Sequence, residues 1–82
     1  MSRAVTLYTR RLCGLCDETA DELRRLRSDL GFDLTEVDID EDASLRERYN
    51  DVVPVVAVGE RVIAHAPVDH AALRADLVAA LG

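Results

Sequence analysis

The chain has 82 residues, a length that allows one domain with a modest core, and we expect residues 1–82 to form it. Hydrophobic residues make up 49% and charged residues 32%, which excludes a disordered chain. The net charge of −6 argues against nucleic acid as a partner, and the lack of an apolar run of about 20 residues argues against a membrane span.

The N-terminal residues show no secretory leader, because Met1–Ala4 leads directly into a β-prone run without an apolar stretch or a cleavage site. We therefore expect a cytoplasmic protein. The run itself, Val5–Tyr8, is β-branched and aromatic and predicts the first strand. Thr9–Leu12 follows it as a loop.

The longest predicted helix runs from Cys13 or Gly14 to Leu30, and Gly31 fits its C-cap. Acidic residues crowd its first turns and arginines its later turns, as the helix dipole favours. Its apolar residues recur at helical spacing and form one stripe, which consists of Cys16, Ala20, Leu23, Leu26 and Leu30.

Two shorter elements are predicted next. Phe32–Ile39 alternates apolar and polar residues, which predicts a strand with one buried face. Asp40–Asn50 predicts a short helix, for which either Asp42 or Ser44 is the N-cap.

A hairpin follows the short helix. Val52–Val58 is strongly β-prone, Gly59-Glu60 interrupts it, and Arg61–Ala64 resumes it, as in two strands joined by a tight turn. Pro54 cannot donate a hydrogen bond within a sheet, so it belongs at the start of its strand. Spacing alone favours a trans Val53-Pro54 bond.

The last helix follows Pro67, with Asp69 as its N-cap. Leu73, Leu77 and Leu81 give this helix an apolar stripe. The complete order is β-α-β-α-β-β-α. It predicts an α/β fold in which three helices flank a four-stranded mixed sheet.

Cys13 and Cys16 form a C-x-x-C motif where the first strand gives way to the first helix. Residues i and i+3 share one face of a helix, so the two sulfurs can approach bonding distance. Cys13 lies at the positive end of the helix dipole, and such motifs lower the pKa of the first thiol from about 8.5 to roughly 3.5–7.5. Arg10 and Arg11 add positive potential, which the two acidic residues after Cys16 partly oppose.

This placement predicts thiol–disulfide exchange. Cys13 attacks a substrate disulfide as the thiolate and forms a mixed disulfide. Cys16, which lies on the apolar stripe and is less exposed, then attacks Cys13 and releases the reduced substrate. An outside reductant resets the pair. An inert, buried cysteine pair is the alternative that spacing alone leaves open.

A resident metal is not expected. A zinc site needs four ligands, and no second cysteine pair completes the motif, while His65 and His70 both lie late in the chain. The acidic residues of Asp38–Asp42 lack the glycine and the ligand spacing of a calcium loop, so we interpret them as a solvated loop with a helix cap.

Four segments carry a resemblance to a known family. They are Leu7-Tyr8-Thr9, Cys13-Gly14-Leu15-Cys16-Asp17-Glu18, Val53-Pro54-Val55 and Gly59-Glu60. In these residues and their order the chain resembles a glutaredoxin-like protein of the thioredoxin superfamily. The resemblance covers essentially the whole chain and implies a thioredoxin-like fold of the glutaredoxin type.

The resemblance also implies roles for individual residues. Cys13 resembles the nucleophile of the family and Cys16 its resolving cysteine. Pro54 resembles the cis proline that faces the sulfurs, and Val53 resembles the residue whose backbone pairs with an extended peptide or glutathione. Asp69 is the one residue that matches the acidic pair with which glutaredoxins bind glutathione. His65 lies in the loop that faces the motif in this fold, where it either tunes the thiolate or is a plain surface residue.

Two departures from the family leave the reductant open. Gly14-Leu15 stands where thioredoxins usually have Gly-Pro and glutaredoxins Pro-Tyr, and Ala64–Asp69 lacks the glycine pair of the glutathione site. The external reductant is therefore either glutathione or a thioredoxin reductase with NADPH, with a slight preference for the reductase. Arg10 and Arg11, beside the motif, are further candidates for contact with the substrate.

We predict a monomeric oxidoreductase without a bound cofactor that reduces protein or small-molecule disulfides and meets a reductase partner. The alternative is a non-catalytic binding module that uses the same thiolates, for example an iron–sulfur cluster or metal carrier between two chains. A domain that keeps the fold but has no reductant is a third possibility.

Overall fold

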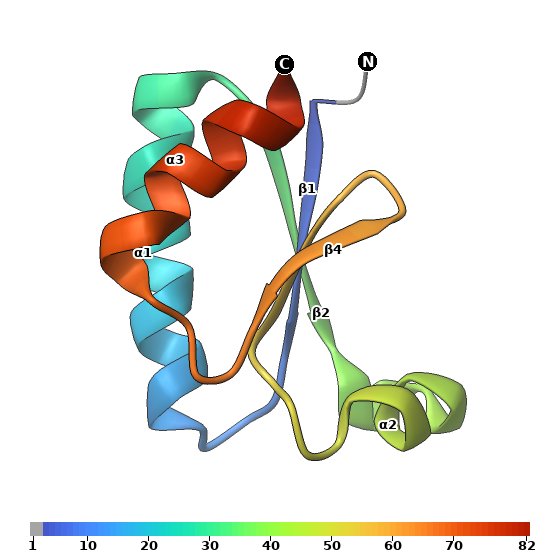
Figure 1. Cartoon of the computed structure of the whole chain (residues 1–82). Helices are drawn as coiled ribbons and strands as arrows, with labels where there is room; N and C mark the ends of the chain where they lie inside the picture. Colours follow the sequence, from blue (N-terminus) through green and yellow to red (C-terminus); the bar gives the residue numbers. More distant parts are fainter. Residues whose placement is uncertain (1–2) are drawn as a thin grey trace.

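Four strands and three α-helices follow each other along residues 3–82, the part of the chain that this computed structural model describes (Figure 1). They occur in the order β-α-β-α-β-β-α, so the predicted α/β class is confirmed. Part of Met1–Ala4, where we noted the absence of a leader, lies outside the described residues. The elements are β1 (Ala4–Thr9), α1 (Gly14–Leu30), β2 (Asp33–Asp38), a 3₁₀ turn η1 (Ile39–Glu41), α2 (Ala43–Tyr49), β3 (Val55–Val58), β4 (Arg61–His65) and α3 (His70–Leu81).

The strands form one four-stranded mixed sheet, as predicted, and their order in it is β2-β1-β3-β4. β1 is parallel to β2, whereas the β1/β3 and β3/β4 pairs are antiparallel. Tyr8, near the end of β1, pairs with Val55 at the start of β3. The residue before Val55, Pro54, is therefore brought to the end of β1 that leads into Cys13.

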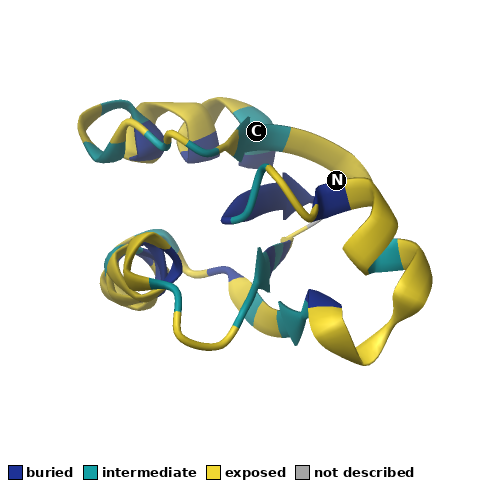
Figure 2. Ribbon diagram, turned by 90° about the horizontal axis from the view of Figure 1, so that it is seen from below, coloured by how far each residue is buried: buried dark blue, intermediate teal, exposed yellow. Residues whose placement is uncertain are grey.

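The two faces of the sheet are covered differently (Figure 1). Helices α1 and α3 lie on one face, and α2 lies beside one end of the other. The face under α1 and α3 holds the main cluster of buried side chains. In Figure 2 the buried residues appear as dark blue stretches of the strands and helices. The main cluster consists of Val5, Leu7, Ala20, Leu23, Leu26, Phe32, Val56, Val58, Leu73, Leu77 and Leu81.

The face toward α2 holds a minor cluster, defined by the buried residues Ile39, Tyr49 and Val55. Tyr8 packs against it, with its ring centroid 4.7 Å from that of Tyr49. Because successive residues of a strand point to opposite faces, β1 supplies Leu7 to the main cluster and Tyr8 to the minor one.

Cys13 caps the N-terminus of α1, which the sequence did not predict, and Gly31 caps its C-terminus, as predicted. The Sγ of Cys13 accepts a hydrogen bond from the backbone N–H of Cys16 at the N-terminus. At the C-terminus Gly31 has φ +70°, a left-handed conformation that glycine adopts without a steric penalty. The predicted apolar stripe faces the main cluster, with Leu30 only partly buried at its edge.

The segment after β2 differs from the prediction in three ways. β2 stops at Asp38 and not at Ile39, because the Asp38 carboxylate accepts a hydrogen bond from the Asp40 N–H and starts η1. The single helix predicted over Asp40–Asn50 is divided, since Asp42 caps a new helix, α2. The expectation of one buried face is also wrong, because Phe32 joins the main cluster and Ile39 the minor one.

β3 begins at Val55, three residues later than predicted. Pro54 has no N–H to give to a ladder, and the N–H groups of Val52 and Val53 both donate to the carbonyl of Tyr49. The Val53-Pro54 bond is cis, so the trans bond favoured by spacing alone is not found, and the Ala66-Pro67 bond is cis as well. Within the described residues, no helix is long and apolar enough to cross a bilayer.

Candidate functional site

Cys13 and Cys16 are joined by a disulfide at the start of α1, with their Cα atoms 5.2 Å apart. The i, i+3 spacing therefore brings the sulfurs together, as the sequence predicts. The backbone N–H of Cys16 also lies 3.2 Å from the Cys13 Sγ. A hydrogen bond to sulfur stabilises the thiolate relative to the thiol once the disulfide is reduced.

The two sulfurs differ in their access to solvent. Cys13 is half-buried, in the N-cap position before the first turn. Cys16 is 0% exposed, because it starts the α1 stripe that faces the sheet. A molecule approaching from solvent can therefore reach the Cys13 side of the disulfide and not the Cys16 side.

Three loops meet at the end of the molecule where α1 begins (Figure 1). One follows β1, one precedes β3, and the third joins β4 to α3. The Ala66 N–H donates to the Val52 carbonyl at 3.0 Å, which ties the second loop to the third. Pro54 is buried and Val53 half-buried in this arrangement, so both predicted residues lie at the same end of the sheet as the disulfide.

Arg10 is bound by other parts of the chain. Its guanidinium contacts both carboxylate oxygens of Asp40 at 3.0 Å, and it donates to the Asn50 Oδ1 at 2.6 Å. The hydrogen bond from Arg10 holds the pKa of Asp40 below its ordinary value, with a further contribution from the charge. Arg10 therefore fastens the loop after β1 to η1 and to the end of α2.

Arg11 differs from Arg10 in that it is exposed and has no side-chain hydrogen bond or ion pair with any of residues 3–82. It lies at a hollow of about 200 Å³ beside the start of α1. Arg24, on the wall of this hollow, is paired with Glu36. The lining residues are Thr9, Arg10, Arg11, Asp17, Ala20, Arg24, Glu36 and Asp38.

Asp69 caps α3, as predicted. Its Oδ1 accepts hydrogen bonds from the N–H groups of Ala71 at 3.0 Å and Ala72 at 3.3 Å. His65 is exposed, and its Nδ1 lies 2.9 Å from the carbonyl oxygen of the next residue, Ala66. The structure thus gives both side chains a local backbone contact.

A polar contact between α1 and α3 is not among the features that the sequence predicts. Thr19 is 1% exposed, and its Oγ1 lies 3.0 Å from the His70 Nε2. The available signal is weak: a threonine stands three residues after Cys16, on the face of the helix that is otherwise apolar. Its partner lies 51 residues away in the sequence, so no local pattern identifies it.

Leu12 and Leu15 are also unexpected features of the site. Both side chains are exposed on either side of Cys13. Leu12 has φ +56° and is the only residue other than glycine with a positive φ among those described. This conformation costs a residue with a Cβ about 1–2 kcal/mol.

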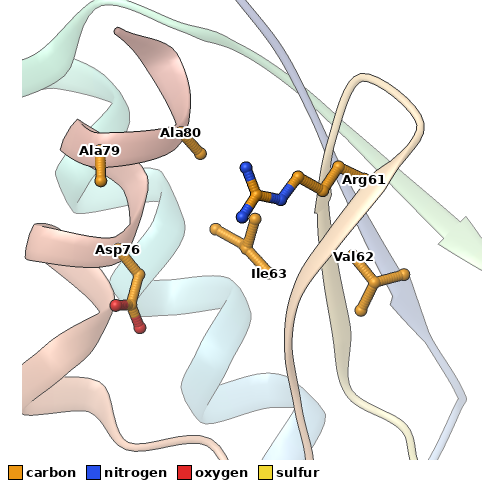
Figure 3. A pocket seen from close by; sticks show the side chains of 6 residues that line it. All are labelled: Arg61, Val62, Ile63, Asp76, Ala79 and Ala80. Atoms are coloured by element: carbon orange, nitrogen blue, oxygen red, sulfur yellow. The ribbon is translucent and has the colours of Figure 1, made fainter.

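No group of three or more His, Cys, Asp or Glu side chains within residues 3–82 is arranged to hold a metal ion. A second hollow, of about 240 Å³, lies between β4 and α3 (Figure 3). Arg61 and Asp76 stand on its opposite sides, and Ile63 lies between them. It lies toward the other end of β4 from the loops that surround the disulfide.

Comparisons with known proteins agree with this architecture. Residues 4–78 match the sequence profile of a family described as "Glutaredoxin-like domain (DUF836)". An uncharacterised protein of Mycobacterium tuberculosis is 41% identical over 83 residues, which cover 94% of this chain and 86% of that protein.

Two solved structures are similar in both sequence and fold. An X-ray structure of a protein from X. campestris has a TM-score of 0.77 at 36% identity and covers 92% of this chain and 96% of its own. A solution NMR structure of a protein from Nitrosomonas europaea, Ne2328, has a TM-score of 0.73 at 35% identity, with coverage of 92% and 91%.

Proposed function

Because the chain belongs to the family of glutaredoxin-like domains, we propose that it is a thiol–disulfide oxidoreductase that uses Cys13 as nucleophile and Cys16 as resolving cysteine. The observation that carries the proposal is the difference in burial between two sulfurs within bonding distance. A half-buried first sulfur that solvent can reach and a fully buried second one define an order of attack.

In the reductive direction the reaction starts from the dithiol. The Cys13 thiolate attacks one sulfur of a substrate disulfide, and the other substrate sulfur leaves as a thiolate and takes up a proton. Cys16 then loses its proton and attacks the Cys13 sulfur, which releases the second substrate thiol. Two electrons pass to the substrate, and the protein returns to the disulfide form.

The surroundings of Cys13 support its role as the attacking sulfur. Its Sγ faces the free N–H groups and the positive dipole end of a 17-residue helix, and it accepts a hydrogen bond from Cys16. Arg11, one residue before Leu12, adds an unpaired positive charge at this end of the molecule. Each contribution favours the thiolate of Cys13 over the thiol.

The proposal includes a monomer in the cytoplasm, no resident cofactor, and an external reductant that resets the disulfide. Glutathione and a thioredoxin reductase with NADPH remain the two candidate reductants. The segment Ala64–Asp69 lacks the glycine pair of the glutathione site, which favours the reductase slightly.

The test is turnover with a disulfide substrate by the wild-type protein and two serine variants. Cys13→Ser is expected to abolish turnover, since no accessible thiol remains. Cys16→Ser is expected to accumulate a mixed disulfide on Cys13, visible as a mass adduct that dithiothreitol removes. Full reductase activity in Cys13→Ser contradicts the proposal, as does a purified protein that holds an oxygen-sensitive coloured cluster on its cysteines.

A further inference from the structure

The exposed large apolar side chains of the described residues fall into two groups. Leu12 is 104% exposed and Leu15 59%, and the two flank Cys13 in the sequence. Val62, 43% exposed on β4, and Val78, 52% exposed on α3, lie on other elements. Single exposed apolar residues are common on protein surfaces, whereas a pair beside a reactive disulfide calls for an explanation.

Both the side chain and the backbone of Leu12 are in energetically unfavourable states. Its side chain is in water, and its backbone is left-handed at φ +56°. Glycine or asparagine would satisfy this backbone at lower cost. The folded monomer gains no burial from this leucine to offset the backbone penalty, which points to a contact with another molecule.

We propose that Leu12 and Leu15, with Arg11 beside them, form the contact surface for protein disulfides whose cysteine is flanked by an apolar and an acidic residue. This inference rests on the proposed function and names its substrate class.

The position of the leucines follows from the exchange reaction itself. A substrate sulfur has to come within bonding distance of the Cys13 Sγ, because Cys16 is inaccessible. The residues on either side of the substrate cysteine then contact the protein surface beside Cys13. Here that surface consists of Leu12 on one side and Leu15 on the other, so an apolar neighbour of the substrate cysteine is removed from water at both contacts.

The positive charge of Arg11, beside the two leucines, is the reason to expect an acidic residue in the substrate. Arg10 is bound to Asp40, and Arg24 to Glu36, so their charges are largely compensated. Arg11 is exposed without such a partner among the described residues. Asp17 and Glu18 on α1 reduce the effect of this charge in part. An acidic side chain that contacts Arg11 directly complements its charge, and a basic one opposes it.

Glutathione fits this surface poorly. It carries two carboxylates and one ammonium group but no apolar side chain, so it leaves both leucines in water. A protein segment in an extended conformation can cover both leucines and reach Arg11 as well. Protein disulfides are therefore the favoured occupant, and oxidised glutathione is the comparison for the test.

The experiment is a single-turnover reaction of pre-reduced protein with three disulfide-linked peptide dimers. The first dimer has a leucine before and an aspartate after the cysteine, the second has a lysine in place of the aspartate, and the third has serine at both positions. Each reaction oxidises one protein dithiol and releases two peptide thiols. Each rate constant is divided by that of 2-mercaptoethanol with the same dimer, which corrects for the intrinsic reactivity of the disulfide.

The wild type is expected to react about tenfold faster with the leucine–aspartate dimer than with the serine dimer or oxidised glutathione, and about threefold faster than with the lysine dimer. Leu12→Ser combined with Leu15→Ser should remove most of the tenfold preference. Arg11→Gln should remove the threefold one. Val62→Ser and Val78→Ser are the matched controls, and both should retain the wild-type preferences.

If the serine variant does not fold, Leu12→Gly replaces it, because glycine suits the left-handed backbone. Equal corrected rates for all dimers overturn the proposed surface but leave the oxidoreductase function intact, and so does a faster reaction with oxidised glutathione. An equal loss of preference in the valine controls also overturns the surface. No oxidation of the reduced protein by any disulfide contradicts the proposed function itself.

Discussion

The two faces of the sheet contribute different parts of the candidate site. The face under α1 and α3 buries the main cluster, and Cys16 lies in the helix stripe that packs on it. The face toward α2 buries only the minor cluster, against which Val53 packs. Polar contacts supplement this smaller core, chiefly those from Arg10 to Asp40 and Asn50.

The two faces of the sheet therefore stabilise different parts of the site, namely Cys16 and the loop before β3. The main cluster holds the buried sulfur of Cys16 in place by dense apolar packing, which leaves little room for displacement. The loop before β3 depends on a few contacts around Tyr49 and on the ion pair of Arg10. Substitutions in the main cluster should therefore lower the free energy of unfolding of the whole domain strongly. Substitutions in the minor cluster should lower it less.

The largest expected difference between the faces is in the free energy of unfolding when one leucine of each cluster is shortened to alanine. Leu23→Ala should lower the free energy of unfolding by about 3–5 kcal/mol, since Leu23 is fully buried in the main cluster. Leu45→Ala should cost about 1–2 kcal/mol, because Leu45 only borders the minor cluster and is half-exposed. Urea unfolding of both oxidised variants measures the difference. Equal losses of unfolding free energy in the two variants would contradict this difference between the clusters.

The next effect concerns the polar contact between α1 and α3. Thr19→Val keeps the shape of the buried side chain but removes its bond to His70, and should cost about 1 kcal/mol. A double-mutant cycle with His70→Gln measures the coupling between the two residues. A coupling energy near zero would show that the contact contributes nothing to the docking of α3.

Leu12 gives an effect of similar size and opposite sign. Leu12→Gly removes the penalty of φ +56° and no buried contact, so the free energy of unfolding should rise by about 1 kcal/mol. The gain is smaller than the full backbone penalty, because glycine also gives the unfolded chain more freedom. Thermal unfolding measures it, and a clear loss of stability would mean that the folded chain uses this leucine.

The smallest expected effect is the pH dependence of the Arg10–Asp40 pair. The folded-state pKa of Asp40 is lowered, so the pair stabilises the protein above the unfolded-state value of about 3.9. This contribution is lost as the pH falls through the folded-state pKa. Asp40→Asn should thus be less stable than wild type at pH 7, with a difference that shrinks below about pH 4. Glu47→Gln, at an exposed α2 residue without an ion pair among the described residues, is the control.

The sequence predicts those features that depend on residues close together in the chain. The caps at Gly31 and Asp69, the α1 stripe and the hairpin all follow from local spacing, and each is found. The i, i+3 pairing of the cysteines belongs to the same class, because one helix turn determines it.

Contacts between individual side chains that lie far apart in the sequence are not predicted. Arg10 resembles a free cation beside the motif until the fold brings Asp40, 30 residues away, against it. Thr19 and His70 meet across a still longer separation. The left-handed backbone of Leu12 has no signal in its residue type either, since leucine rarely adopts it.

The central claim is that Cys13 is an accessible thiolate and that Cys16 is a buried thiol behind it. Timed alkylation of the reduced wild-type protein with iodoacetamide at pH 7, with each cysteine followed by peptide mass spectrometry, tests it most directly. The account predicts that Cys13 reacts faster than the thiol of an unstructured peptide and at least tenfold faster than Cys16. Equal rates for the two cysteines, or a Cys13 no faster than the peptide thiol, would contradict it.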